Sequence, residues 1–231
     1  MKRAITLSCL ILFGAVLICA TTKPVSQSGT QRPAPKYISI RTEDHKQVSA
    51  TYYPPAVRNA PAVILIPDTR CDGSVFGDFA SKLHEAGFAV LAMDLRYKDL
   101  IAKVRRGKIN VLQSQDTYAP VNYEIKSAIE LLGSQKEDNS DRIGLLGESY
   151  GSGLALHAGV RYKVKALVLI SLSCHDESCR ALKDREPIQE LLNEFGSRPI
   201  LFMTTEKDWV GNYKAAEQNR LFSSGLKGQR N

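Results

Sequence analysis

The five residues from Gly147 to Gly151, in the order Gly-Glu-Ser-Tyr-Gly, form the pattern of this chain that most directly suggests chemistry. They follow an apolar run that ends at Leu146 and precede a helix-like segment of small and apolar residues, 152–160. Between a strand and a helix, G-x-S-x-G holds its serine in a strained turn, and the glycines let strand and helix pass close together. We therefore predict that Ser149 is a nucleophile at the carboxyl edge of a sheet, with a helix N-terminus behind it that favours negative charge. The alternative interpretation is an ordinary Gly-Ser turn, because the pattern is short and both residues are common in turns.

Hydrophobic periodicity surrounds this turn with alternating strands and helices. Alternating apolar and polar residues predict a hairpin of two strands at 37–41 and 47–53. Apolar runs predict further strands at 62–66, 88–95, 142–146, 165–172 and 199–203. Helical spacing of apolar residues predicts helices at 76–86, 121–132, 152–160, 187–195 and 212–223. This order predicts an α/β fold: a mostly parallel central sheet begun by an antiparallel hairpin, with helices on both faces.

The motifs, in this order, resemble the α/β-hydrolase fold family, and most closely its bacterial esterase and serine-peptidase-like branch. The resemblance runs from about Tyr37 to the end of the chain. It rests on the hairpin and the strand at 62–66, on Asp94-Leu95-Arg96 at the end of the next strand, on the turn at 147–151, and on the strand and turn at 199–208. The resemblance implies one α/β-hydrolase domain over residues 37–231.

The resemblance also implies roles for individual residues. Ser149 would attack an ester or amide carbonyl and form an acyl-enzyme. Asp208 matches the acid that orients a catalytic histidine, with Glu206 as the nearest substitute; a carboxylate that caps the turn is the alternative for Asp208. The backbone N–H groups of Tyr150 and Thr69 would form the oxyanion hole.

Two departures from the family pattern bear on activity. Pro67-Asp68 stands where the family often has His-Gly, which puts a carboxylate near the expected oxyanion. No histidine follows Asp208, whereas the family places its histidine after the acid, on a loop behind an eighth strand. We therefore expect the final strand to be missing and the domain to be shortened at its C-terminus.

The four histidines all precede the acid. His175 lies on a loop after a strand, at the correct edge of the sheet, so it is the only internal candidate for a replacement base. His45 is expected in an exposed turn, and His84 and His157 on helices, where packing explains them.

Two hypotheses of function follow. The first is a serine hydrolase that acts on a small-molecule carboxylic ester or amide through Ser149; because no histidine follows Asp208, an inactive form of such a hydrolase is the variant of this hypothesis left open. The second is an exported, non-catalytic α/β-hydrolase-like binding protein, which the missing histidine supports and the intact turn opposes.

The N-terminus has the features of an export signal. Lys2 and Arg3 precede an almost wholly apolar segment up to Ala20, so residues 1–20 are predicted to be a signal peptide. Residues 21–36 are rich in Pro, Ser, Thr and Gln and are predicted to be a flexible tether. We expect a periplasmic or extracellular protein. Cys19 leaves open a lipoprotein anchor as the only link to a membrane, although Ile18 before it does not fit that signal well.

Composition limits the remaining possibilities. The 231 residues include 43% hydrophobic and 24% charged residues, and the formal net charge is +7. The positive residues are scattered and lack an interleaved aromatic pattern, so we expect no nucleic-acid partner. Cys174 and Cys179 could close a small disulfide loop, and Cys71 is left over. Although His175 and Asp176 lie between the paired cysteines, no second ligand cluster accompanies them, so we predict neither a metal nor another cofactor.

Overall fold

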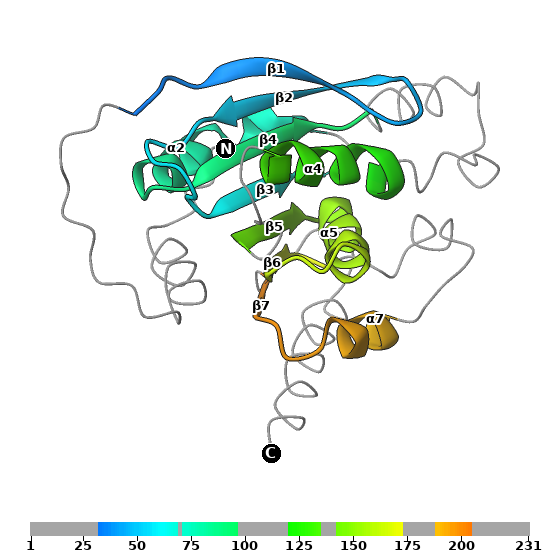
Figure 1. Ribbon diagram of the computed structural model, residues 1–231. Coiled ribbons are helices and arrows are strands. Elements are labelled where there is room, and N and C mark those ends of the chain that lie inside the picture. Colours follow the sequence, from blue (N-terminus) through cyan, green and yellow to red (C-terminus); the bar gives the residue numbers. More distant parts are fainter. Residues whose placement is uncertain (1–31, 69–70, 97–119, 135–141, 173–187, 205–231) are drawn as a thin grey trace.

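The computed structural model describes residues 32–68, 71–96, 120–134, 142–172 and 188–204. Within these ranges a single seven-stranded sheet has the order β1-β2-β4-β3-β5-β6-β7 (Figure 1). The strands are β1 Lys36–Arg41, β2 Gln47–Tyr53, β3 Ala62–Ile66, β4 Ala89–Asp94, β5 Ile143–Glu148, β6 Ala166–Ile170 and β7 Ile200–Met203. The helical elements are η1 Gly73–Phe76, α2 Gly77–Glu85, the π-helical η4 Pro120–Ile125, α4 Lys126–Ser134, α5 Tyr150–Arg161 and α7 Ile188–Phe195.

The pairing of the strands confirms the predicted fold class. β1 and β2 form an antiparallel hairpin, and β2 also runs antiparallel to β4. All pairs from β4 through β3, β5 and β6 to β7 are parallel. The helix expected at 212–223 and the expected absence of a final strand concern residues outside the described ranges.

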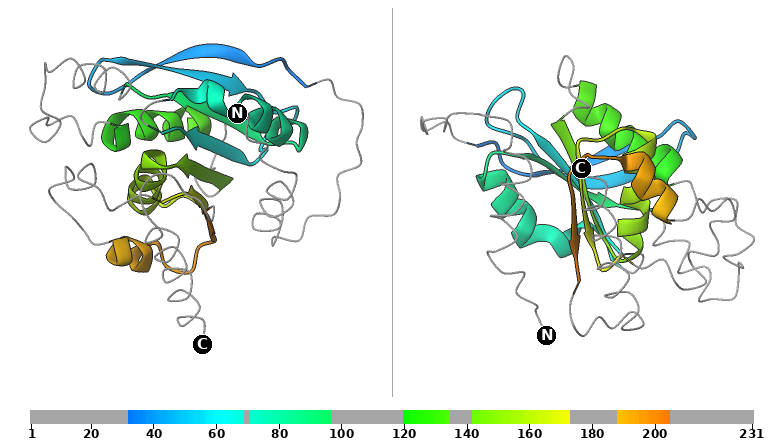
Figure 2. Two further views of the ribbon diagram at one scale, coloured as in Figure 1. Left: turned by 180° about the vertical axis from the view of Figure 1, so that it is seen from behind. Right: turned by 90° about the horizontal axis from the view of Figure 1, so that it is seen from below.

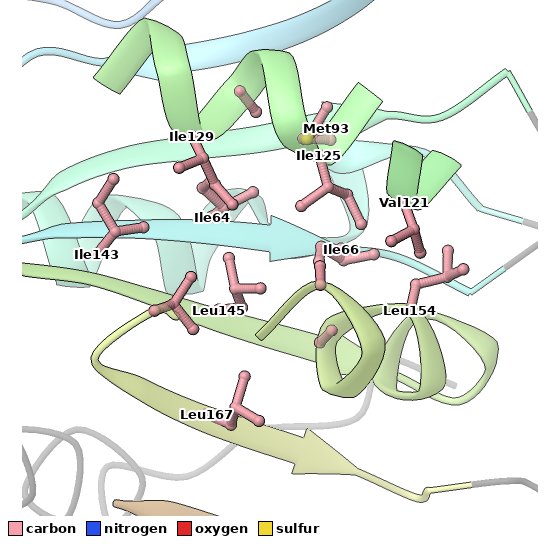
Figure 3. Close-up of a cluster of buried hydrophobic side chains, with 14 of the residues drawn as sticks. Ile64, Ile66, Met93, Val121, Ile125, Ile129, Ile143, Leu145, Leu154 and Leu167 are labelled. Atoms are coloured by element: carbon pink, nitrogen blue, oxygen red, sulfur yellow. The ribbon is translucent and has the colours of Figure 1, made fainter. Parts of the chain in front are cut away.

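Helices cover both faces of the sheet. The view from below shows α2 on one face and α4, α5 and α7 on the other (Figure 2). All five residues of β3 are buried, and their side chains alternate between the two layers. Val63 and Leu65 pack on the side of α2, whereas Ile64 and Ile66 belong to the larger cluster on the side of α4 and α5 (Figure 3). Burial on both faces explains why β3 is a continuous apolar run rather than an alternating one.

The strand directions bring several connections to one edge of the sheet. The parallel strands all end at their carboxyl edge, which is where ligands bind in open α/β sheets. β2 runs the opposite way, with Ser49 paired to Asp94 at the end of β4, so the hairpin turn at 42–46 lies at this same edge. No helix in the described part of the chain has the length and apolar character needed to cross a membrane.

Candidate active site

Ser149 occupies the turn between β5 and α5 with a strained backbone. Its φ is 54° and its ψ is −119°, in a region that a residue with a side chain rarely adopts. Ser149 is the N-cap residue of α5, yet its side chain makes no capping hydrogen bond. A serine in an ordinary N-cap has an extended backbone and uses its hydroxyl to accept from the first helical turn. The strained backbone of Ser149 confirms the predicted sharp turn. Together with the lack of a capping hydrogen bond from its hydroxyl, it disfavours an ordinary Gly-Ser turn.

The two glycines of the motif are required by close backbone contacts. A Cβ built on Gly147 would lie 2.1 Å from the carbonyl oxygen of Gly151. A Cβ built on Gly151 would lie 2.3 Å from the carbonyl oxygen of Ile66 at the end of β3. Real Cβ atoms do not approach backbone oxygen so closely, so only glycine fits at either position. The predicted reason for both glycines is thus confirmed, and the second contact also holds α5 against the start of the β3–η1 loop.

Hydrogen bonds fix the turn itself. The Ser149 N–H donates to the carbonyl of Ile170 on β6 at 2.9 Å. The Ser149 carbonyl accepts from the N–H of Ser152 at 3.0 Å and from its hydroxyl at 2.5 Å. Ser149 is only 9% exposed. Both backbone groups are thus tied to rigid elements, which places the side chain reproducibly at the end of β5.

Several solved structures of hydrolases have a similar fold. An α/β hydrolase from Penicillium sp. sh18, GrgF, shares 15% identity with this chain, with a TM-score of 0.58 over 82% of this chain and 86% of the other. An esterase from Pyrococcus furiosus shares 14% identity, with a TM-score of 0.60 over 90% of this chain and 83% of the other. The thioesterase domain from the curacin biosynthetic pathway shares 13% identity, with a TM-score of 0.57 over 83% and 90%. At these identities the likeness shows the fold alone. No curated protein sequence matches the chain.

The sequence model of the dienelactone hydrolase family matches residues 48–226, which is more than half of the chain. The chain belongs to the dienelactone hydrolase family. The predicted membership of the α/β-hydrolase fold family is therefore confirmed, and the protein is a hydrolase of the α/β type by family.

The structure places only part of the predicted site of this dienelactone hydrolase family member. Ser149 and Tyr150 are described, and Tyr150 is the first residue of α5, where backbone N–H groups are positioned to donate to an anion. Thr69, His175, Glu206 and Asp208 lie outside the described residues, as do Cys19, Cys174 and Cys179. Their predicted roles therefore remain predictions.

His45, His84 and His157 lie in the described part of the chain. His45 is exposed in the hairpin turn with a φ of 61°. A ring nitrogen of His84 lies 2.8 Å from the carbonyl oxygen of Pro54, and the ring packs against that of Tyr53. Burial lowers the pKa of His157 on α5, so its imidazole is held in the neutral form. These observations agree with the interpretation that packing accounts for His84 and His157.

Two polar residues at the end of β4 have partners that sequence reasoning missed. The carboxylate of Asp94 accepts from the backbone N–H of Gly73 and from the hydroxyl of Tyr37, both at 2.8 Å. Arg96 contacts Asp44 in the hairpin turn and Glu124 in η4. The Asp-Leu-Arg sequence marks Asp94 and Arg96 as candidates for a role, but no sequence signal points to Asp44 or Glu124.

The ion cluster of Asp44, Arg96 and Glu124 is buried at its centre. Glu124 is fully buried; its Oε1 lies 2.5 Å from Nε of Arg96, and its Oε2 accepts from the Arg96 backbone N–H at 3.1 Å. Nη1 and Nη2 of Arg96 reach the two carboxylate oxygens of Asp44 at 2.5 and 3.1 Å. Burial raises the pKa of Glu124 above its ordinary value, while the hydrogen bond from Arg96 holds the pKa of Asp44 well below its own. The cluster ties the hairpin turn, the end of β4 and η4 together.

Proposed function

We propose that this chain is a carboxylic ester or amide hydrolase that reacts through an acyl-enzyme on Ser149. The observation that carries the proposal is the backbone of Ser149, strained at φ 54° in the turn just before α5, in a chain of the dienelactone hydrolase family. A nucleophile on such a turn has its hydroxyl directed out of the sheet edge instead of into the helix cap. Two of the structurally similar proteins are an esterase and a thioesterase, which supports substrates of the acyl-ester class.

The chemistry would proceed in two halves. The Ser149 oxygen forms a bond to the carbonyl carbon while its proton passes to a general base, and the carbonyl oxygen becomes an oxyanion. Backbone N–H groups of Tyr150 and Thr69 would stabilise that oxyanion, aided by the dipole of α5. The bond to the leaving alcohol or amine then breaks, and the leaving group takes the proton. Water attacks the acyl-enzyme in the second half and releases the acid.

The general base is the open part of the proposal. Asp208 would hold a histidine in the correct tautomer, but the 231-residue sequence has no histidine after it. His175 is the candidate from within the sequence. If His175 is the base, His175→Ala should abolish the reaction as fully as Ser149→Ala, whereas His84→Ala should not affect the chemistry beyond its effect on folding.

A fluorophosphonate probe tests the proposal, because it labels serines that a base has activated. The wild-type chain should label and should hydrolyse p-nitrophenyl esters of short acids, and Ser149→Ala should lose both. Asp208→Asn should reduce both, while Glu206→Gln should leave them near wild type. Equal labelling of the wild type and Ser149→Ala would rule out the serine mechanism and favour the alternative of an exported, non-catalytic binding protein.

We also propose export through residues 1–20, with Cys19 as the only candidate for a lipid anchor. The positive start and the apolar run of this segment support the proposal. Mass spectrometry of the mature protein from an expressing bacterium tests it. An N-terminus after residue 20 supports a freely exported protein, an acylated Cys19 supports an anchored one, and an intact Met1 in the cytoplasm would contradict export.

A further inference from the structure

The parallel strands all begin at one edge of the sheet, here called the amino edge. The starts of β3, β4 and β5 lie side by side there, since Ala62 pairs with both Ala89 and Ile143. β1 begins at the same edge, because its first residue, Lys36, pairs near the end of antiparallel β2 (Figure 1). Ser149 follows β5 at the other end, and the six residues of that strand span about 20 Å. The amino edge is therefore opposite the candidate active site.

Cations from distant parts of the sequence meet along the amino edge. Arg142, just before β5, donates from Nη1 to the carbonyl of Asn59 in the connection between β2 and β3. The N–H of Lys165, just before β6, donates to the carbonyl of the first residue of β5 at 2.8 Å. Arg198, just before β7, donates from Nη1 to the carbonyl of Val164 at 2.9 Å. These contacts join the starts of β3, β5, β6 and β7 into one continuous surface.

This surface carries an excess of exposed positive charge. Within the described residues, its exposed acids are Glu85 at the end of α2 and Glu194 near the end of α7. Its exposed cations are more numerous: Lys36, Arg58, Lys82, Arg142, Arg161, Lys163 and Lys165. Among the described residues, no carboxylate forms an ion pair with Arg58, Lys163 or Lys165. The charges of these three side chains are therefore available to an anionic partner.

An exposed apolar side chain lies among the cations. Val57, in the connection between β2 and β3, is 56% exposed and directly precedes Arg58. The whole connection from residue 54 to residue 61 lies at the amino edge, because β2 ends there and β3 begins there. Cations combined with an exposed apolar side chain suit the interface of a bilayer with anionic headgroups.

The path of the chain also favours a bilayer as the partner. The segment predicted to be a tether, residues 21–36, joins the domain at the start of β1, and thus at the amino edge. A chain that is held at a membrane through its first residues would bring this edge to the surface. Ser149, at the opposite edge, would then remain open to solution.

We infer that the amino edge is a docking surface for a bilayer that contains anionic phospholipids. The cations at the starts of β1, β3, β5 and β6 contact the headgroups, and Val57 enters the interfacial layer. This docking goes beyond the hydrolase function and does not depend on the activity of Ser149. It is also separate from acylation of Cys19, because the described domain itself supplies the contacts.

Cosedimentation with vesicles tests the inference on the processed protein carrying Cys19→Ser, so that no lipid anchor contributes. The protein should bind vesicles of equal parts phosphatidylglycerol and phosphatidylcholine more tightly than vesicles of phosphatidylcholine alone, and added salt should weaken this binding. Lys163→Gln/Lys165→Gln should weaken it by about 5-fold for each charge removed. Arg41→Gln/Lys46→Gln is the matched control with the same change in net charge at the opposite edge, and it should bind within about 2-fold of the parent protein.

All four side chains in these variants are exposed, so both variants should keep the denaturation midpoint of the parent protein. Equal binding to the two kinds of vesicle, or an equal loss of binding in the two variants, would overturn the inference. Binding to soluble polyglutamate without binding to anionic vesicles would also overturn it, and would favour an acidic polymer as the partner.

Hydrogen exchange tests which edge meets the bilayer without any substitution at the surface. On addition of anionic vesicles, the backbone amides of residues 56–59 should exchange more slowly. Those of the hairpin turn at 42–46, at the carboxyl edge, should keep their rates. Slower exchange at 42–46 with no change at 56–59 would show that another surface docks.

Discussion

The turn at residues 147–151, here called the elbow, carries Ser149. It lies at the same edge of the sheet as the ion cluster of Asp44, Arg96 and Glu124, but different interactions hold the two in place. The elbow consists of five consecutive residues and is held by backbone contacts that only glycine permits. The ion cluster joins residues from the hairpin turn, the end of β4 and η4, and is held by charges on long side chains. The elbow requires that Gly147 and Gly151 have no side chain, whereas the cluster requires side chains of opposite charge that contact one another.

This difference has consequences for mutation. A close backbone contact has no room to relax, so a single added methyl group must move a strand or a helix. A buried ion pair gives little net stability, because desolvation of the charges offsets their attraction, but it becomes costly when one partner is lost. The two glycines of the elbow should therefore tolerate no added side chain. The cluster should tolerate replacement of both partners of an ion pair by apolar residues, but not of one partner alone.

The largest effect is expected at Gly151. Gly151→Ala would bring a Cβ within 2.3 Å of the carbonyl oxygen of Ile66, and we expect the free energy of unfolding to fall by more than about 4 kcal/mol. Urea denaturation followed by circular dichroism measures this. Gly133→Ala is the matched control, because no atom of the described residues lies within 4 Å of a Cβ built there, and it should leave stability unchanged or raise it by up to about 1 kcal/mol. Similar losses in both variants would contradict the contact argument.

The second effect concerns Arg96. Arg96→Leu leaves the carboxylate of Glu124 buried without its cation, and we expect a loss of about 3 kcal/mol at neutral pH. Burial already raises the pKa of Glu124, and removal of the cation should raise it further. When folding raises the pKa of an acid, the fold loses stability as the pH rises from the unfolded-state pKa toward the raised pKa, so the loss should shrink toward pH 4. The double variant Arg96→Leu/Glu124→Leu should recover most of the stability. A double variant with no higher free energy of unfolding than Arg96→Leu would contradict the claim that the unpaired Glu124 carboxylate causes the loss.

A third effect is a pH dependence at Asp44. The hydrogen bond from Arg96 lowers the pKa of Asp44, so its stabilising contribution is present above the unfolded-state pKa of about 3.9 and is lost as the pH falls below it. The difference in unfolding free energy between the wild type and Asp44→Asn should therefore shrink from pH 5 to pH 3. Denaturation curves for both proteins at each pH measure the difference. A difference that stays constant over this interval would show that Asp44 does not titrate with a lowered pKa.

The smallest effect is expected at the outer ion pair of Lys126 with Glu43. The side chain of Glu43 is 55% exposed, and solvent and salt screen such pairs. Lys126→Met should leave the denaturation midpoint unchanged at physiological salt. A loss of unfolding free energy comparable to that of Arg96→Leu would mean that the charges around the hairpin turn act as one unit. Buried and exposed ion pairs would then not differ in their contribution to stability here.

The sequence predicts the fold well because its signals are local. The apolar runs of β3 and β4, the alternation in the hairpin and the small residues of α5 each follow from the periodicity of strands and helices. The π-helical start of the helix at 120–134 was not predicted, since an apolar face looks alike in π- and α-helical turns. The hydrogen bond from the Gly73 N–H to Asp94 was not predicted either, because a side chain that accepts from a backbone N–H 21 residues away leaves no pattern in the sequence.

By itself, the sequence determined the α/β architecture, the position of Ser149 in a strand-turn-helix unit and the need for glycine at 147 and 151, because consecutive residues carry all of this information. Only the tertiary structure decided which carboxylates surround Arg96 and which side chain holds Gly73. Asp44 reaches Arg96 because β2 runs antiparallel to β4 and returns the hairpin turn to the carboxyl edge, and Glu124 reaches it from η4. Strand order and direction set such contacts, and they are global properties that no short stretch of residues encodes.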